Sequence, residues 1–214
     1  MQLFWSEPEH PVVAGDPPHT SRRQSPFPRG SRRNESSRLA ILDAALAVCR
    51  EVGYAKLTIE AIAARAGVGK QTIYRWWPSK GAVILEAFQR GSAGIPVPDT
   101  GEVVDDVRTL ITRVVDLFAD PDFGPHLSAL IGEAQYDRHV RSALLEDFIK
   151  PRRAPVVQRL KTAQQQGQLD LSVDPEALLE VTFGALYHRL LLRNAPLDKS
   201  YAAHVPTRSF ARNR

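Results

Sequence analysis

The sequence predicts an all-α fold, and three observations support it. Apolar residues recur at three- and four-residue steps through most of residues 34–205, which is the period of helices that bury one face. No segment shows the alternation of apolar and polar residues that is typical of a half-buried strand. Glycines and prolines separate the periodic segments, where helices are expected to begin or end. No internal repeat is visible in the 214 residues.

Residues 1–33 are predicted to be a disordered, basic, proline-rich arm, because six prolines interrupt them and no apolar period would bury them. The end of this arm holds five arginines, Arg22, Arg23, Arg29, Arg32 and Arg33. A flexible arm of this kind can follow a phosphate backbone or enter a minor groove. A tail without a role and an N-terminus extended by a misassigned start codon are the alternatives.

Four helices are expected in residues 34–91. The first carries an apolar stripe from Leu39 to Val52 that includes Cys49, which we expect to be buried, and Gly53 suits its end. Thr58 is placed to cap a second helix over residues 59–66, which Gly67 ends.

A third helix should run from Lys70 to Trp77, because Pro78 disfavours helical geometry in the residue before it. Ser79 would then cap a fourth helix that ends near Gly91.

Residues 91–101 are predicted to be a linker between two domains, since glycine and proline dominate them. Further helices are expected near residues 102–119, 125–135, 138–149, 152–166 and 174–194. A short helix at about 198–205 and a frayed tail over 206–214 complete a second domain, which spans residues 99–205.

The second and third helices, with the turn AGVG between them, have the pattern of a helix-turn-helix. On a helical wheel, Ile73 and Trp77 share a face that should be buried with Val68. The opposite face carries polar side chains and is flanked by aromatic ones, which an ordinary solvated hairpin does not explain. Its members are Gln71, Thr72 and Arg75, with Trp76 on one flank and Tyr74 and Lys70 on the other. Glutamine, arginine and a threonine methyl can each contact base edges in the major groove.

The charge is unevenly distributed. Residues 21–90 carry 13 Lys and Arg against 5 Asp and Glu, whereas residues 91–214 carry 15 against 16. A basic N-terminal half joined to a nearly neutral C-terminal half favours a module that binds a polyanion. A solvated basic face, or binding to anionic lipid or another acidic partner, remains open on charge alone.

Residues 38–88 resemble the DNA-binding domain of the TetR family of bacterial transcriptional regulators. The matching pieces include Arg38 with Ile41–Ala45, Gly53-Tyr54, Leu57–Ile59, Ile62-Ala63, Ala66–Val68, Thr72–Tyr74 and Ser79-Lys80. Gly69 departs from the pattern, because many relatives have Ser or Thr there. The resemblance implies a homodimer that binds double-stranded DNA at a near-palindromic operator, with residues 34–91 as the helix-turn-helix domain and residues 99–205 as a ligand-binding and dimerisation domain.

The resemblance also implies which side chains contact DNA. Thr58, Tyr74 and Lys80 match positions that bind phosphate, and Gln71, Thr72, Arg75 and Trp76 match positions where base and backbone choice varies. The full predicted set of DNA contacts is Arg38, Thr58, Lys70, Gln71, Thr72, Tyr74, Arg75, Trp76 and Lys80.

Relatives use the C-terminal domain for an effector pocket and a four-helix dimer bundle. By that similarity, the predicted pocket residues are Phe88, Leu110, Val114, Phe118, Phe123, Leu127, Ile131, Tyr136 and Phe183. The predicted interface residues are Val156, Val157, Leu160, Leu178, Leu179, Phe183, Leu186 and Leu190. Each of these apolar positions is also compatible with the core of one subunit.

Other classes of function have less support. The single cysteine is typical of a reducing compartment, and no apolar run is long enough to span a membrane, so a cytoplasmic protein is expected. His126, His139 and His188 lack the spacing of metal ligands, so no metal site and no cofactor are predicted. We find no catalytic motif and predict that the protein is not an enzyme. The alternative is a helical protein that binds nucleic acid or an anionic surface non-specifically through its basic arm.

Overall fold

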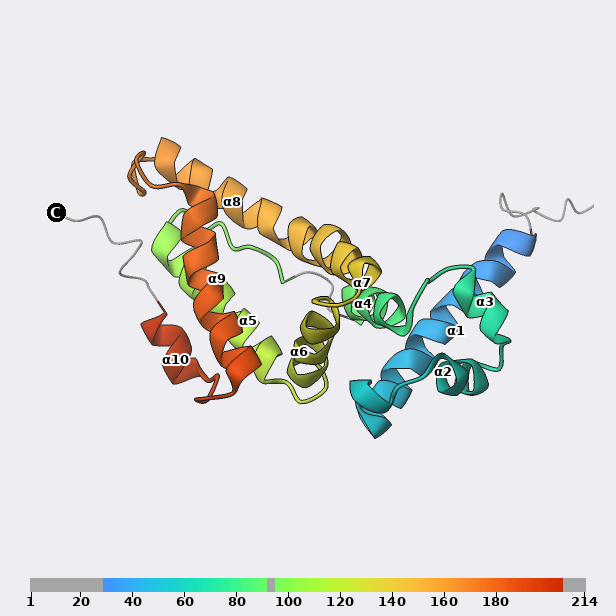
Figure 1. Ribbon diagram of the computed structural model, residues 1–214. Helices are drawn as coiled ribbons and strands as arrows, with labels where there is room; N and C mark the ends of the chain where they lie inside the picture. Colours follow the sequence, from blue (N-terminus) through green and yellow to red (C-terminus); the bar gives the residue numbers. More distant parts are fainter. Residues whose placement is uncertain (1–28, 92–94, 206–214) are drawn as a thin grey trace, which may run out of the picture.

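The computed structural model describes residues 29–91 and 95–205, and these residues form helices, turns and loops without a strand (Figure 1). The predicted all-α fold is confirmed. The first part of the 1–33 arm and the 206–214 tail lie outside the described residues, whereas Arg29–Arg33 do not. These five residues begin the first helix, α1 (Arg29–Val52), so the helix starts inside the segment predicted as a disordered arm. Pro28 is the last proline of this stretch. The residues after it contain no proline, and they join the rest of α1 without a break.

The N-terminal domain contains the predicted helices. After α1 come a 3₁₀ turn, η1 (Tyr54–Lys56), and then α2 (Ile59–Ala66), α3 (Lys70–Tyr74) and α4 (Lys80–Gly91). The third helix is shorter than the predicted 70–77. Its last turn tightens, because the Trp76 and Trp77 amides both donate to the Ile73 carbonyl. Cys49 is buried in α1, as predicted, and burial raises the pKa of its thiol to about 11.

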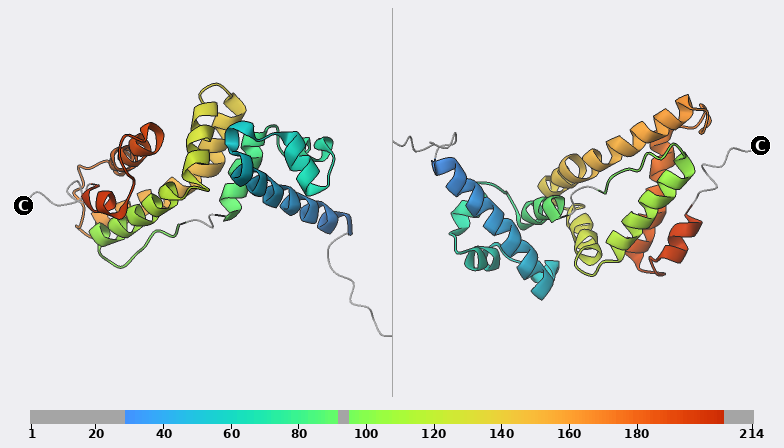
Figure 2. Two further views of the ribbon diagram at one scale, coloured as in Figure 1. Left: turned by 90° about the horizontal axis from the view of Figure 1, so that it is seen from below. Right: turned by 180° about the vertical axis from the view of Figure 1, so that it is seen from behind.

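The C-terminal domain contains the remaining helices. They are α5 (Val103–Ala119), α6 (Gly124–Glu133), α7 (Arg138–Ser142), the π-helical segment η2 (Ala143–Ile149), α8 (Lys150–Gln165), α9 (Pro175–Leu192) and α10 (Lys199–His204). In Figure 1, α9 lies in front of α5, and the view from behind reverses that order (Figure 2). Asp174 caps α9 by accepting a hydrogen bond from the Glu176 amide, as Asp-Pro at its start predicts.

The predicted break between residues 149 and 152 is wrong, because α7, η2 and α8 follow one another without interruption. Pro151 has no amide hydrogen. In a regular α-helix, the Asp147 carbonyl four residues earlier would therefore have no backbone donor. The π-helical turn spaces the bonds differently, and the Gln89 side chain of α4 donates to the Asp147 carbonyl. A side chain from another helix therefore satisfies part of the backbone that proline leaves open.

The two domains meet where α6 packs against η1 and where α4 packs against α7. The buried Tyr54 hydroxyl donates a 2.6 Å hydrogen bond to Glu133, at the end of α6. A Cβ at Gly81 would lie 2.9 Å from Val140 and 3.0 Å from the Tyr54 hydroxyl, so the glycine permits this close approach. Burial, and then the hydrogen bond to Glu133, raises the pKa of Tyr54, which therefore remains a neutral donor.

The predicted dimer residues on α8 and α9 do not form an accessible face. Their exposed fractions are 8% or less, apart from the partly buried Phe183. The seven buried residues are Val156, Val157, Leu160, Leu178, Leu179, Leu186 and Leu190. A side chain must be accessible in one subunit to contact another, so the interface prediction is wrong at these positions. They pack the core between α5, α8 and α9 instead.

Candidate nucleic-acid interface and ligand cavity

The helix-turn-helix forms through two local signals that the sequence predicts. The Thr58 hydroxyl accepts a 3.1 Å hydrogen bond from the Ala61 amide and so caps α2. Gly67 ends α2 in the left-handed conformation, at φ 66°, which a residue with a Cβ adopts less readily. Gly69 lies at the N-cap of α3 without a side-chain hydrogen bond, as expected for a residue that has replaced Ser or Thr.

One side of α3 holds the helix in the domain. Ile73 is fully buried and Trp77 is 3% exposed, as predicted, and Val68 packs against the same core. The Trp77 indole donates a 2.7 Å hydrogen bond to Glu86 of α4. Burial of a large aromatic residue with its polar atom satisfied fixes the orientation of α3 on α4.

The other side of α3, together with the turn that follows it, is accessible. Gln71 and Arg75 are exposed, Thr72 is half-buried, and Tyr74 and Trp76 are 49% and 43% exposed. Arg75 has no ion-pair partner in the part of the chain that the structure describes. The structure therefore brings together the predicted set of possible base-contacting side chains on one surface.

Trp76 lies between this surface and α1. The Arg38 guanidinium is 5.9 Å from the centre of the Trp76 ring, and the Trp76 and Trp77 rings are 6.3 Å apart. Arg38 also forms ion pairs with Glu35, at 2.9 Å, and with Glu86. Arg38 thus forms a cation–π contact with Trp76, and the sequence did not predict this contact.

The two lysines in the predicted set of DNA contacts, Lys70 and Lys80, already have protein partners. Lys70 forms a 2.9 Å ion pair with Glu60, whose pKa is lowered by the hydrogen bond from the lysine. Lys80 is half-buried, donates to the Tyr54 carbonyl at 3.2 Å and lies 4.7 Å from the Tyr54 ring centre. The exposed Lys70 pair is a weak interaction that a phosphate can replace, whereas Lys80 would have to leave a more enclosed position.

A cavity lies in the C-terminal domain, with a volume of about 810 Å³ when its open mouth is included. Five of the predicted pocket residues line it: Leu110, Val114, Phe118, Phe123 and Phe183. Ten further lining residues were not predicted: Ile95, Val97, Leu117, Phe148, Ile149, Arg152, Arg153, Val156, Leu179 and Tyr187.

Four predicted pocket residues do not line the cavity. Phe88 is buried and its ring lies 4.7 Å from that of Phe123, behind the cavity wall. Leu127 and Ile131 pack in the core on α6. Tyr136 is 95% exposed, because it lies in the turn after α6, and its prediction as a pocket residue is wrong.

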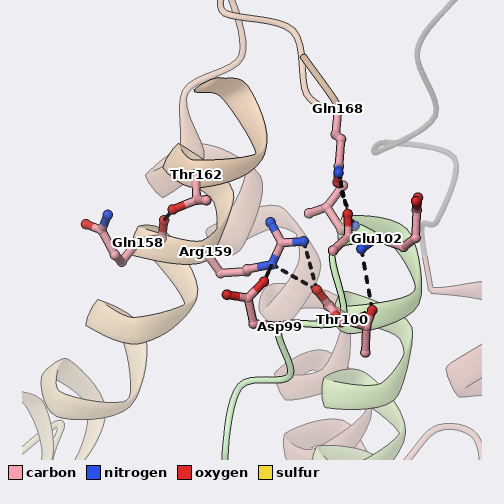
Figure 3. Close-up of polar contacts among 10 residues, drawn as sticks. Asp99, Thr100, Glu102, Gln158, Arg159, Thr162 and Gln168 are labelled. Carbon is pink, nitrogen blue, oxygen red and sulfur yellow. Dashed lines mark hydrogen bonds and ion pairs between the residues drawn. The ribbon is translucent and has the colours of Figure 1, made fainter. Parts of the chain in front are cut away.

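Residues 95–101, which we call the strap, form one wall of the cavity and are fastened at both ends. Near its start, the Pro96 carbonyl accepts a 3.2 Å hydrogen bond from Arg113 of α5. Near its end, the Thr100 amide and hydroxyl donate to Asp106 at 3.0 and 2.8 Å. Gln168 donates to the Gly101 carbonyl (Figure 3).

The fastening of the strap depends on a buried ion pair. Arg159 of α8 donates to Asp106 at 2.8 Å and lies 3.2 Å from Asp99 (Figure 3). The Asp106 side chain is fully buried and that of Arg159 is 5% exposed. Burial tends to raise the pKa of Asp106, but the hydrogen bonds from Thr100 and Arg159 together lower it below its usual value.

These observations define a class of protein: a helix-turn-helix DNA-binding domain joined to a helical domain with its own cavity. Comparisons with known proteins agree. A family model described as bacterial regulatory proteins, tetR family, matches residues 41–87, and one described as tetracyclin repressor-like, C-terminal domain, matches residues 97–207.

The chain is also similar to individual members of that family. YdeS of Bacillus subtilis (strain 168), an uncharacterized HTH-type transcriptional regulator, is 33% identical over 183 residues, covering 85% of this chain and 92% of YdeS. The crystal structure of the TetR family transcription regulator SCO0332 is 33% identical, with a TM-score of 0.71 over 82% of this chain and 97% of that one. The chain belongs to the TetR family and is a transcriptional regulator with a DNA-binding domain.

More distant structures share the fold. FadR from Bacillus subtilis, solved in complex with stearoyl-CoA, is 18% identical, with a TM-score of 0.63 over 80% of this chain and 96% of that one.

Among the residues that the structure describes, no helix is long and apolar enough to cross a membrane.

Proposed function

We propose that the protein is a transcriptional repressor that binds a near-palindromic operator as a homodimer and is released by a small-molecule effector. The accessible face of α3 carries this proposal, because Ile73 and Trp77 hold that helix in the core while Gln71, Thr72 and Arg75 remain free to approach base edges. In a dimer, each α3 would enter a major groove, and the half-sites would be separated by about one helical turn or a multiple of it.

The face through which two subunits would pair is the exposed side of α9. Its residues recur at alternating steps of four and three, which is the spacing of a helix-packing seam. They are Ala177, Val181, Gly184, His188 and Leu191, with Leu192 beside them. Val181 is 65% exposed, Leu191 41% and Leu192 63%, and this apolar stripe on one helix suits a second copy of the same helix.

Helix α6 connects the cavity to the DNA-binding domain. Phe123, at its N-cap, lines the cavity, and Glu133, in its last turn, accepts the hydrogen bond of Tyr54. An effector that fits the cavity better in one position of α6 would favour one orientation of the helix-turn-helix. Release from DNA requires that it bind the unbound form of the protein more tightly than the DNA-bound form.

Selection of bound duplexes from a random pool tests the proposal. We expect a palindromic site whose half-site spacing follows from the dimer. Recovery of duplexes without any symmetric site would contradict the proposal, and would favour non-specific binding instead.

Substitution of Tyr74 by Phe is expected to weaken binding to all DNA sequences by about tenfold, because a hydroxyl that donates to phosphate is lost in each subunit. The measurement is a titration of operator and scrambled duplexes at one salt concentration. Tyr136→Phe, which changes an exposed tyrosine outside the helix-turn-helix, is the matched control. A loss confined to the operator would show that Tyr74 reads bases.

Substitution of Gln71 by Ala is expected to relax the preference at one base pair in each half-site, since a bidentate contact contributes about 1–3 kcal/mol of discrimination. Repeating the duplex selection with the variant measures this change. Gln165→Ala, at the exposed end of α8, serves as the control. An unchanged sequence profile would exclude direct readout by Gln71.

A further inference from the structure

The cavity between α5, α8 and α9 is apolar but not neutral. Twelve of its fifteen lining residues are aliphatic or phenylalanine, and the other three are Arg152, Arg153 and Tyr187. No Asp or Glu is among the fifteen. The wall therefore presents positive charge and no negative charge to whatever occupies the cavity.

The two arginines have different surroundings. The Arg153 guanidinium donates to Glu176 at 2.7 Å and to Glu180 at 3.2 Å, so carboxylates of α9 compensate its charge. Arg152 lies with its guanidinium carbon 3.8 Å from the centre of the Phe148 ring and donates to the Phe148 carbonyl at 2.8 Å. Burial lowers the pKa of Arg152, which means that its surroundings solvate its charge poorly.

Tyr187 provides a neutral donor beside this charge. Its ring centre lies 5.4 Å from that of Phe118, and its hydroxyl has no hydrogen-bond partner among the residues that the structure describes. Burial raises the pKa of Tyr187, against the opposing effect of Arg152, so the phenol keeps its proton at neutral pH. Arg152 and Tyr187 both line the cavity, and a guanidinium and a phenol are both donors to an oxyanion.

We infer that the effector is an amphipathic anion: one carboxylate, held by Arg152 and Tyr187, on an aliphatic or aromatic body that fills the space between Phe118, Phe123 and Phe183. This inference rests on the proposal that the cavity is the effector site. It names the chemical class of that effector.

Other ligand classes fit the wall less well. An apolar cation would place its charge beside Arg152 with no carboxylate in the wall to compensate it. A neutral apolar molecule would fill the space but would offer no charged acceptor to the Arg152 guanidinium or the Tyr187 hydroxyl. A ligand with several charges would bury some of them against aliphatic side chains.

A series of three probes with the same chain length tests the charge preference. Binding of decanoate, decan-1-ol and decylammonium to the full chain is measured by calorimetry, below their micellar concentrations and without DNA. We expect decanoate to bind about tenfold more tightly than decan-1-ol, as for a hydrogen bond to a charged group, and decylammonium to bind most weakly. Equal affinity for the alcohol, or tightest binding of the ammonium, would overturn the inference.

Variants then assign the preference to Arg152. Arg152→Gln should lower decanoate affinity to that of decan-1-ol without changing decan-1-ol binding, and Arg152→Lys should keep most of the preference. Lys161→Gln removes one charge from the exposed side of the same helix and should change neither. If Arg152→Gln keeps the full tenfold preference, or if Lys161→Gln removes it, the assignment is wrong.

Failure of the inference and failure of the proposed function are distinguishable. If decanoate binds with the expected preference but never lowers operator affinity, the ligand class stands and effector-driven release fails. If decan-1-ol or decylammonium binds more tightly and also releases DNA, effector-driven release stands and the anion preference fails.

Discussion

Substitution of Val181 by Asp is expected to convert the protein into a monomer and to lower its operator affinity by about 10²–10⁴-fold. Val181 is 65% exposed in the middle of α9, on the seam of small and apolar residues that we propose as the dimer interface. In a twofold-symmetric contact, both copies of the new carboxylate would be buried against an apolar surface close to each other. Loss of the second subunit removes the gain in affinity that comes from two linked half-site contacts.

The stability of the single subunit should change little, because Val181 is exposed there and surface substitutions usually shift the free energy of unfolding by about 0.5 kcal/mol or less. Sedimentation measures the oligomeric state, and a duplex titration measures operator affinity. Tyr136→Asp introduces the same carboxylate at another exposed position, outside α9, and should remain dimeric. A Val181→Asp variant that is still dimeric at micromolar concentration would place the interface elsewhere.

The helix-turn-helix could be predicted from sequence because its signals are local. Thr58 and Gly67 fix the two ends of the second helix, and the wheel of the third helix has one apolar and one polar side. When a helix has one apolar and one polar face, its sequence predicts that the apolar face is buried. The structure confirms this at Ile73 and Trp77.

The face of α9 could not be predicted in the same way, since apolar residues surround that helix. Leu178 and Leu186 are buried, whereas Val181 and Leu192 are exposed, yet all four are apolar in the sequence. The positions of the neighbouring helices, α5, α6, α8 and α10, decide which side of α9 is covered. The predicted interface therefore selected the buried side.

The cavity shows a related limit. Phe118, Phe123 and Phe183 were identified because aromatic residues at helical spacing are visible in the sequence. Arg152 and the strap were not, because a basic residue after a proline and a glycine- and proline-rich linker resemble solvated segments. Both line the cavity only because the chain continues as a helix through the π-helical turn and the linker folds back over α5.

Substitution of Asp106 by Asn is expected to lower the free energy of unfolding by about 3 kcal/mol, the lower end of the range for breaking a buried ion pair. Arg159 would keep its charge in a site where it is 5% exposed, and only the largely exposed Asp99, 3.2 Å away, would compensate it. Urea unfolding at pH 7 and a fixed protein concentration measures the loss. A loss below about 1 kcal/mol would show that the pair contributes little.

The double variant Asp106→Asn with Arg159→Met separates the charge from the fold of the strap. Methionine removes the uncompensated charge, and asparagine can still accept the Thr100 amide hydrogen bond, so we expect recovery of more than half of the lost stability. If the double variant is as unstable as Asp106→Asn, the loss comes from the strap contacts and not from the buried charge.

The same carboxylate predicts a pH dependence with a definite sign. The pKa of Asp106 is lower in the folded chain than in the unfolded chain, where it is about 3.9. Its contribution to stability is therefore complete above about pH 4 and is lost as the pH falls through the folded pKa. The stability difference between the parent chain and Asp106→Asn should be constant from pH 7 to pH 5 and should shrink as the pH falls below 4. A difference that stays constant down to pH 2 would show that folding does not lower the pKa of Asp106. A difference that grows as the pH falls from 7 to 5 would show that burial outweighs the hydrogen bonds from Thr100 and Arg159 and raises the pKa instead.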